Sequence, residues 1–204
     1  MGLISNGTSI FDAGSMAAGL GSSMKFIKKL TASSSATLSF VDGTSDVVLD
    51  DTYKEYLFTF NNIHPATDSA EFQFNLSVDS GSNYNVTKTS TYFYAYHYED
   101  GSSTSLTYNT SGDLAQSTAF QDIAVNVGSD NDQCTSGYLH LFNPSSTTFV
   151  KHWISKMNNA HSGDLMINPH TAGYGNTTSA VDAIQFKMDS GNIDAGDICL
   201  YGIN

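Results

Sequence analysis

Residues 91–98 read Thr-Tyr-Phe-Tyr-Ala-Tyr-His-Tyr, and this stretch restricts most strongly how the chain can fold. Side chains of a β-strand point alternately to its two faces, so every second residue shares a face. A helix would distribute the same aromatic rings around its whole circumference. The stretch therefore predicts a strand with four tyrosines on one face, namely Tyr92, Tyr94, Tyr96 and Tyr98.

Alternation of apolar and polar residues recurs along most of the chain. Its clearest runs are residues 36–40, 56–60, 71–78 and 183–188. Asn143-Pro144 separates two further strand-like runs, 137–142 and 147–155, and predicts an antiparallel hairpin. Charged residues make up only 14% of the chain, against about 25% in a typical soluble domain. We therefore expect an all-β fold, a two-sheet antiparallel β-sandwich with the topology of a jelly roll.

The first 23 residues differ in composition from the rest, because small residues and glycines dominate and bulky apolar residues are few. One interpretation is a disordered tail. The other is an extended N-terminal arm that docks on a neighbouring subunit, with Ile10 and Phe11 as its anchors. The sequence thus predicts an arm over 1–23 and a single β-sandwich domain over 24–204, a size that all-β domains reach undivided.

The charge of the chain argues against several classes of partner. Its net charge is −12, and all eight basic residues are lysines, so arginine is missing. Arginine is the usual reader of phosphate and of guanine, and an acidic surface repels nucleic acid and anionic membranes. We therefore expect neither nucleic acid nor membrane as a partner. The N-terminus also lacks the pattern of a signal peptide, so we expect synthesis in the cytoplasm of the cell that makes the protein.

Motifs for catalysis or cofactor binding are missing from the sequence, including Gly-x-Ser-x-Gly, His-Glu-x-x-His and the phosphate-binding loops. His140 and His152 lie on the two arms of the expected hairpin, where a structural pair is favoured over a metal site. The run 130–132, Asp-Asn-Asp, is read as a solvated loop in preference to a Ca²⁺ site. Cys134 and Cys199 are left open as free thiols or a disulfide. We expect no catalytic residue, cofactor or metal.

The tyrosine face allows two interpretations. Its rings can fill an interface between sheets or subunits. Alternatively, they form an exposed aromatic platform for sugar rings or another protein, because tyrosine combines apolar area with a hydroxyl group. The polar segment 99–118 that follows would then contribute to binding.

Three blocks of the sequence carry a resemblance to a known family. They are Tyr53 to Pro65, Gly137 to His152, and Gly175 to Ile203. The chain resembles, over nearly its whole length including the Ile4-Ser-Asn-Gly-Thr opening, virion structural proteins of marine tailed bacteriophages, among them those of cyanobacteria. Most such proteins are known only as parts of the particle, so the resemblance carries over no site residues.

The resemblance implies a non-enzymatic structural protein on the virion exterior, either a head decoration or an appendage or fibre subunit. It would assemble with copies of itself, as a trimer by analogy with phage appendages, and would contact capsid or tail proteins. The alternative function is a carbohydrate-binding module for host attachment that uses the tyrosine face to bind host-surface glycans.

Overall fold

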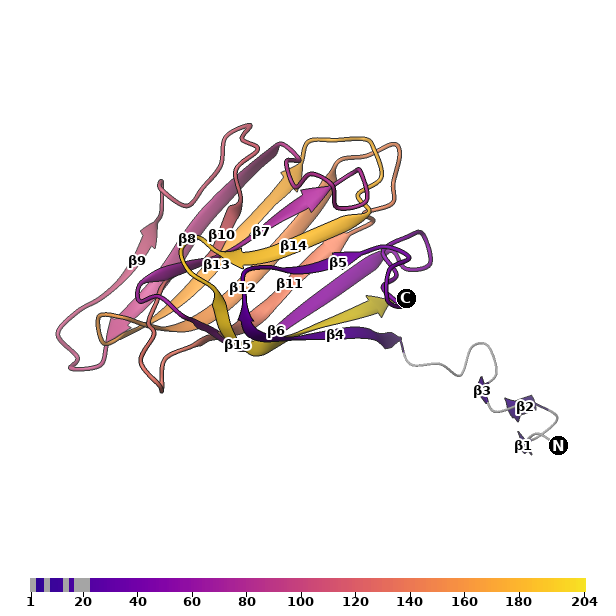
Figure 1. Cartoon of the computed structure of the whole chain (residues 1–204), viewed down its shortest axis with the longest axis horizontal. Coiled ribbons are helices and arrows are strands. Elements are labelled where there is room, and N and C mark those ends of the chain that lie inside the picture. The colour runs from indigo at the N-terminus through magenta and orange to yellow at the C-terminus, as the bar shows by residue number, and fades with distance from the viewer. Residues whose placement is uncertain (1–2, 6–7, 13–14, 17–22) are drawn as a thin grey trace.

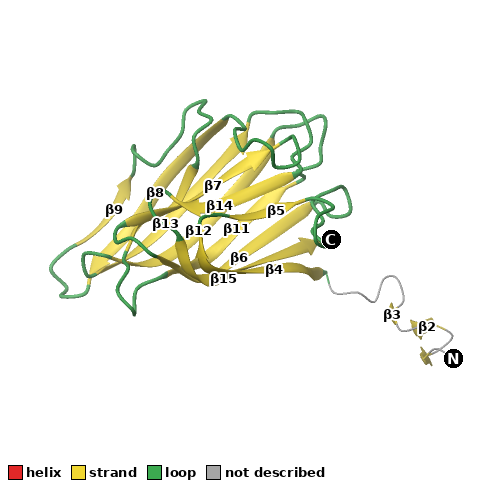
Figure 2. Ribbon diagram, viewed as in Figure 1, coloured by secondary structure: helices red, strands yellow, loops and turns green. Residues whose placement is uncertain are grey.

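A computed structural model describes residues 3–5, 8–12, 15–16 and 23–204, with side chains from residue 23 onward. These residues form strands joined by turns and loops, without a helix (Figure 2), so the predicted all-β class is confirmed. The strands are β1 (Leu3–Ser5), β2 (Thr8–Asp12), β3 (Ser15–Met16), β4 (Met24–Ser35), β5 (Leu38–Val41), β6 (Glu55–Pro65), β7 (Ala70–Ser77), β8 (Lys88–Tyr98), β9 (Thr104–Tyr108), β10 (Gln121–Val127), β11 (Thr135–Phe142), β12 (Lys151–His161), β13 (Leu165–Gly175), β14 (Ala183–Met188) and β15 (Ile193–Ile203).

One continuous antiparallel sheet of twelve strands forms the body of the molecule and folds into two layers (Figure 1), which we call the larger and the smaller sheet. The larger has the order β4-β15-β6-β11-β12-β13-β8-β9, and the smaller has the order β10-β7-β14-β5. A single ladder pair between β10 and β12, Val127 with His161, joins the two sheets at one corner. The predicted antiparallel, sandwich-like all-β fold is thus confirmed, with the difference that its two layers are continuous through this pair.

Eight of the strands follow the path of a jelly roll. The strands β4-β15-β6-β11 form one half and β5-β14-β7-β10 form the other, and the chain passes between the halves at most connections. This is the double Greek-key order expected for that fold. Two hairpins are inserted in this path: β8 with β9 between β7 and β10, and β12 with β13 between β11 and β14.

Inward-facing aromatic rings from both sheets form the core, as the period-two alternation predicts. Phe58 and Phe60 on β6 meet Phe186 on β14, with ring centroids 5.5 and 5.2 Å apart. Phe74 on β7 packs edge-on against Trp153 on β12 at 5.0 Å. All five side chains are essentially inaccessible to solvent. Burial of each such ring removes a large apolar area from water, which is the main favourable term of folding.

The predicted hairpin at Asn143-Pro144 is also present. β11 and β12 pair in register, with Leu141 opposite Trp153 and His140 opposite Ile154. Asn143 takes a positive φ of 45°, a conformation that asparagine tolerates better than most residues.

The inserted strands extend the larger sheet past the smaller one. β10 ends the smaller sheet, whereas β13, β8 and β9 continue the larger sheet beyond it, at the left of Figure 1. The inner side of β8 is consequently only partly covered. In the N-terminal segment, Ile10 and Phe11 lie on β2, but their side chains fall outside the part of the chain described, so their predicted role as anchors stays a prediction.

Candidate functional site

The four tyrosines of β8 share the inner face of the larger sheet, as the alternation predicts. Tyr92 is fully buried, and it clusters with Val125, Leu165 and Ile167 from β10 and β13. The other three tyrosines of this face are only half-buried, because they lie where the smaller sheet no longer covers β8. Each of the two interpretations of the tyrosine face therefore describes a part of it.

The planes of the three half-buried rings are inclined to one another and do not form a flat platform. The ring centroids of Tyr94 and Tyr96 are 6.4 Å apart with planes inclined by 49°. Those of Tyr96 and Tyr98 are 5.9 Å apart and nearly perpendicular, at 86°. Successive rings are thus strongly inclined to one another.

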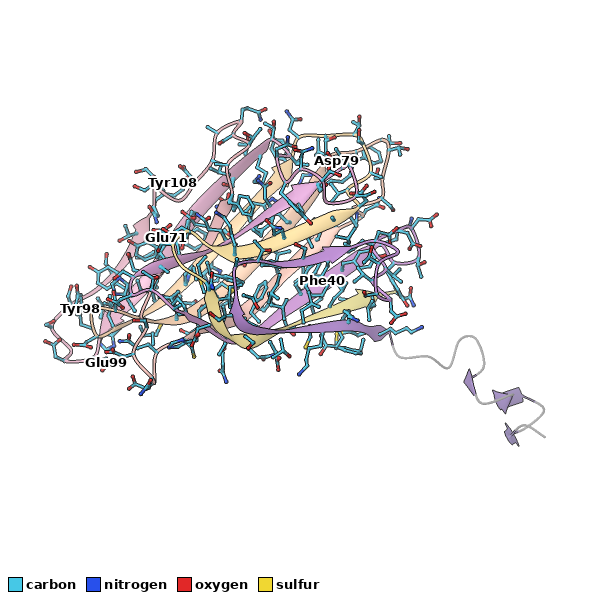
Figure 3. All side chains as sticks on the ribbon, in the orientation of Figure 1. Phe40, Glu71, Asp79, Tyr98, Glu99 and Tyr108 are labelled. Atoms are coloured by element: carbon cyan, nitrogen blue, oxygen red, sulfur yellow. The ribbon has the colours of Figure 1, made fainter. Side chains whose placement is uncertain are left out.

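A pocket of about 490 Å³ lies over these rings. Its size is within the range of small-molecule sites, about 300–1,000 Å³. The lining residues come from five strands and the segment after β9; they are Glu71, Tyr94, Tyr96, Tyr98, Asn109, Ser111, Val125, Asn126, His161, Leu165 and Ile167. Figure 3 labels Tyr98 and Glu71 on the same side of the molecule. The pocket combines aromatic and aliphatic surface with amides and hydroxyls.

The segment after β9 forms one wall of the pocket. The Asn109 N–H donates to the Tyr92 carbonyl at 2.8 Å, which extends the contact with β8 past the end of β9. The Asn109 side-chain oxygen accepts the N–H groups of Ser111 and Gly112 at 3.0 and 3.2 Å. This is the local turn that asparagine favours. Gln121 on β10 holds the wall in place, because its side-chain amide donates to the Gly112 carbonyl at 2.7 Å.

Glu71 is the carboxyl group among the lining residues of the pocket. Burial, followed by the hydrogen bond to Asp122 and the charges of Asp122 and Asp189, raises the pKa of Glu71 to about 8. Burial also raises the pKa of Asp122, whose oxygen accepts the Gln73 amide at 2.6 Å. Burial of two hydrogen-bonded carboxyl groups side by side disfavours their double ionisation, and Glu71 is the group whose pKa is raised above 7. Glu71 is therefore mostly neutral at pH 7.

His161 lines the opposite side of the pocket. Burial lowers its pKa below the ordinary value, against a smaller opposing effect of the Asp68 carboxylate, so its ring is neutral at pH 7. The Gly163 N–H donates to Nδ1 of His161 at 2.9 Å. Nδ1 thus acts as an acceptor, which places the ring proton on Nε2. Both titratable lining groups whose pKa is displaced consequently present hydrogen-bonding groups without a charge.

Tyr92 closes the inner end of the tyrosine row. Its hydroxyl is buried and has no hydrogen-bond partner among the described residues. Burial, together with the nearby charges of Asp122 and Glu71, raises the pKa of this hydroxyl. A buried hydroxyl without a partner costs free energy, so packing of the ring must account for its position.

The geometry of the carboxyl pair does not fit hydrolysis of a glycosidic bond. That reaction places the substrate between two carboxyl groups about 5–9.5 Å apart. Glu71 and Asp122 instead hydrogen bond directly to each other. The arrangement supports binding of a neutral, hydroxyl-rich molecule by stacking and hydrogen bonds.

The predicted histidine pair on the hairpin does not form. His140 and His152 both lie on the outer side of the larger sheet, but His140 pairs with Glu55 and stacks on Phe142. His152 packs against the ring of Tyr174, with centroids 6.1 Å apart.

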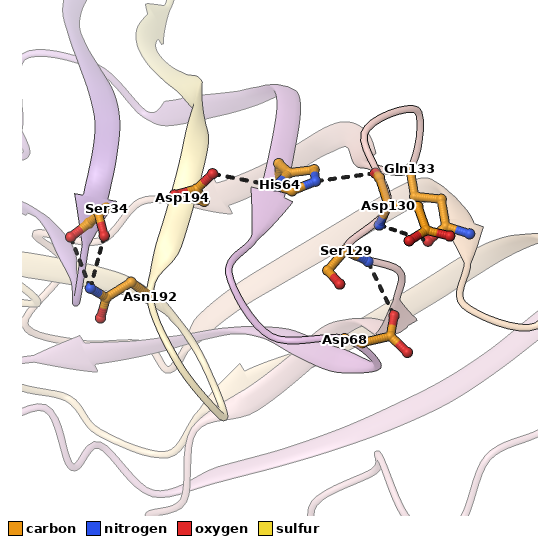
Figure 4. A network of polar contacts seen from close by, with 8 residues as sticks. All are labelled: Ser34, His64, Asp68, Ser129, Asp130, Gln133, Asn192 and Asp194. Carbon is orange, nitrogen blue, oxygen red and sulfur yellow. Dashed lines mark hydrogen bonds and ion pairs between the residues drawn. The ribbon is translucent and has the colours of Figure 1, made fainter.

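The loop that contains Asp130, Asn131 and Asp132 is held by polar contacts (Figure 4). Nε2 of His64 lies 3.2 Å from the Asp130 carbonyl, and its Nδ1 lies 3.8 Å from the Asp194 carboxylate. The described residues contain no group of three histidine, cysteine or acidic side chains that could hold a metal ion. Cys134 and Cys199 are free thiols.

Sequence reasoning missed Glu71, Asn126 and His161 as pocket residues. Glu71 begins the alternating run 71–78 and reads as part of a solvated strand face. The strand order decides which strands lie near β8, and local sequence pattern does not reveal that order. Besides the tyrosines, Asn109 and Ser111 carry a signal in the sequence, because they belong to the polar segment expected to contribute to binding.

Comparisons with known proteins give no relative for this chain: no family model, no curated protein and no solved structure matches it. Within the described residues, no helix is long and apolar enough to cross a membrane.

Proposed function

We propose that this protein is a non-enzymatic carbohydrate-binding protein, and that the pocket over Tyr94, Tyr96 and Tyr98 is its binding site. The observation that carries the proposal is the combination of three partly exposed tyrosines with the polar groups of Asn109 and Ser111 around one space. Sugar rings offer apolar faces for stacking and hydroxyl groups for hydrogen bonds. Tyrosine and amide side chains provide the matching surfaces.

The electrostatics of the pocket favour a neutral sugar over an acidic one. Glu71 and His161 are both mostly uncharged at pH 7, for the reasons of burial given above. An anionic sugar would meet the field of Asp122 and Asp189 behind Glu71 and of a chain with net charge −12.

The inclination of the rings indicates the form of the ligand. A flat row of coplanar rings suits the surface of an insoluble, crystalline polysaccharide. Here the planes of neighbouring rings differ by 49° and 86°, so a single flexible glycan chain fits better than a flat surface. Successive tyrosines on one strand face are about 6.6 Å apart, and three of them therefore span about 13 Å, enough for more than one sugar ring.

A glycan array followed by calorimetric titration of the bound glycans tests the proposal. We expect neutral oligosaccharides to bind, and we expect Tyr96→Ala to weaken binding at least about tenfold through loss of the stacked ring. His97→Ala is the matched control, because His97 is the next residue on the same strand and lies exposed on the opposite face. Failure of every glycan to bind, or equal losses in both variants, would refute the proposal.

The second candidate is a structural protein on the exterior of a phage particle, which is compatible with carbohydrate binding during host attachment. It rests on the three resemblance blocks and on the exposed outer side of the larger sheet, which offers a surface for assembly. Host-surface glycans, capsid or tail proteins and further copies of the chain would be its partners. Immunolabelling of intact particles tests this location; label that remains in the soluble fraction of lysed hosts and never on particles would contradict it.

A further inference from the structure

From residue 23 onward, most of the large apolar side chains that are exposed lie on the outer side of the larger sheet. Eight of ten such side chains in this part of the chain point outward from the sheet, as their pairing registers place them. They are Met24, Phe26, Phe93, Leu106, Tyr108, Tyr138, Ile154 and Met166. The carbohydrate pocket lies on the other side of the same sheet, so this outer face is a separate feature.

A row of uncharged and histidine side chains crosses the centre of the outer face. The pairing registers join it strand by strand, from β4 to β8, through Phe26, Tyr201, Leu57, His140, Ile154, Ala172 and Thr91. Ile154 lies near the middle of the row and is 49% exposed. Phe26, at one end, packs edge-on against Tyr201 with centroids 5.6 Å apart and is still 54% exposed.

The next row is equally continuous and contains no carboxylate. It runs through Lys29, Cys199, Thr59, Tyr138, Lys156, His170, Phe93 and Tyr108. The His170 ring stacks on Phe93 with planes inclined by only 4°. The chain has 20 acidic residues, yet neither row includes one.

The two carboxylates beside these rows each have a partner within the chain. Nζ of Lys29 lies 3.1 Å from the Asp197 carboxylate. The Glu55 carboxylate pairs with His140. The outer face therefore differs from the rest of a molecule whose net charge is −12. Two copies that approach through any acidic surface repel each other, whereas two copies that approach through this face do not.

The face is also large enough for a stable contact between two proteins. The larger sheet has eight strands, which lie about 4.8 Å apart. A strand of eleven residues, such as β12, is about 36 Å long. With strands of this length the face covers roughly 1,200 Å². A standard interface buries about 800 Å² on each partner. Exposed apolar patches of more than a few hundred Å² mark interaction sites on soluble proteins.

We infer that two copies of this chain pack face to face through the outer side of the larger sheet, with Ile154 near the centre of the contact. A single continuous surface that meets its own copy is an isologous contact, which closes at two subunits. The expected assembly is thus a dimer, in place of the trimer expected from the sequence. In this dimer the two tyrosine pockets face away from the contact, on opposite sides of the assembly.

Analytical ultracentrifugation of the full chain and of two variants tests the inference. We expect the parent protein to be a dimer and Ile154→Lys to raise its dissociation constant at least about 100-fold, because the new ammonium would be buried beside Lys156 without a partner. Val78→Lys is the matched control: Val78 is 38% exposed but lies outside the larger sheet, so this variant should dimerise like the parent. Circular dichroism and thermal unfolding verify that both variants fold.

Three outcomes would overturn the inference. The first is a parent protein that is still monomeric at about 100 μM, above the micromolar range expected for an interface of this size. The second is an Ile154→Lys variant that assembles like the parent. The third is assembly that survives Ile154→Lys but disappears when residues 1–22 are deleted, which would assign the contact to the N-terminal segment.

Discussion

A Cβ atom at Gly112 would lie 2.2 Å from Cδ1 of Tyr92, so glycine is the residue that lets the pocket wall rest on this ring. We expect Gly112→Ala to lower the free energy of unfolding by about 1–3 kcal/mol, because the buried ring or the wall must shift. Chemical denaturation measures the change. Ser111→Ala serves as the control, since Ser111 is exposed, and should unfold within about 0.5 kcal/mol of the parent. Equal stabilities for all three proteins would contradict this packing.

The carboxyl pair at the pocket makes stability depend on pH. Glu71 has a pKa of about 8 in the folded chain, against 4.5 as its ordinary value, so the folded state binds more protons between these values. Its contribution is fully present below about pH 4.5 and is lost as the pH rises through 8. The difference in unfolding free energy between the parent and Glu71→Gln should therefore fall steadily from pH 5 to pH 8. One proton limits the slope to about 1.4 kcal/mol per pH unit, and solvent near this half-buried group reduces the total change in free energy further.

Lys88 should produce the opposite dependence at higher pH. Burial lowers the pKa of its amine from 10.5 to about 7, and Nζ donates to the Asn75 side-chain oxygen at 2.5 Å and to the Val86 carbonyl at 2.8 Å. The folded state binds fewer protons than the unfolded state between pH 7 and 10.5, so stability rises with pH across this window. Urea titrations at pH 7 and pH 9.5 should show this rise in the parent and not in Lys88→Met. A parallel rise in both proteins would mean that another group is responsible.

The aromatic core provides a direct test of the fold. Phe186 is fully buried, and five other phenylalanine rings from both sheets lie with their centroids 5.2–6.4 Å from its own, so Phe186→Ala should cost about 3–5 kcal/mol. Phe149→Ala removes an identical side chain that is 69% exposed in the loop before β12, outside the proposed contact face, and it should leave thermal unfolding nearly unchanged. Similar melting temperatures for the two variants would show that the strand faces are assigned incorrectly.

The fold class could be predicted because alternation is a local property. Phe74 and Phe186 lie in the alternating runs 71–78 and 183–188, and both are fully buried. The pocket could not be predicted, since Tyr92 and Tyr96 are identical in local pattern, yet one is fully buried and the other half-buried. Strand order, set by contacts far apart in sequence, decides this. The position of Glu71 at the pocket could not be predicted for the same reason, because it depends on the pairing of β7 with β10.

The separation of the buried residues into two clusters has a consequence for motion. The main cluster lies between the halves of the jelly roll, whereas Tyr92 and its three neighbours form a second, smaller cluster under the pocket. Regions with few buried apolar contacts open at a lower free-energy cost than the whole molecule. The end of the sandwich that holds the inserted hairpin β8–β9 can therefore open locally as a small cooperative unit and close again around a bound ligand. The aromatic core between the two layers stays folded during this motion.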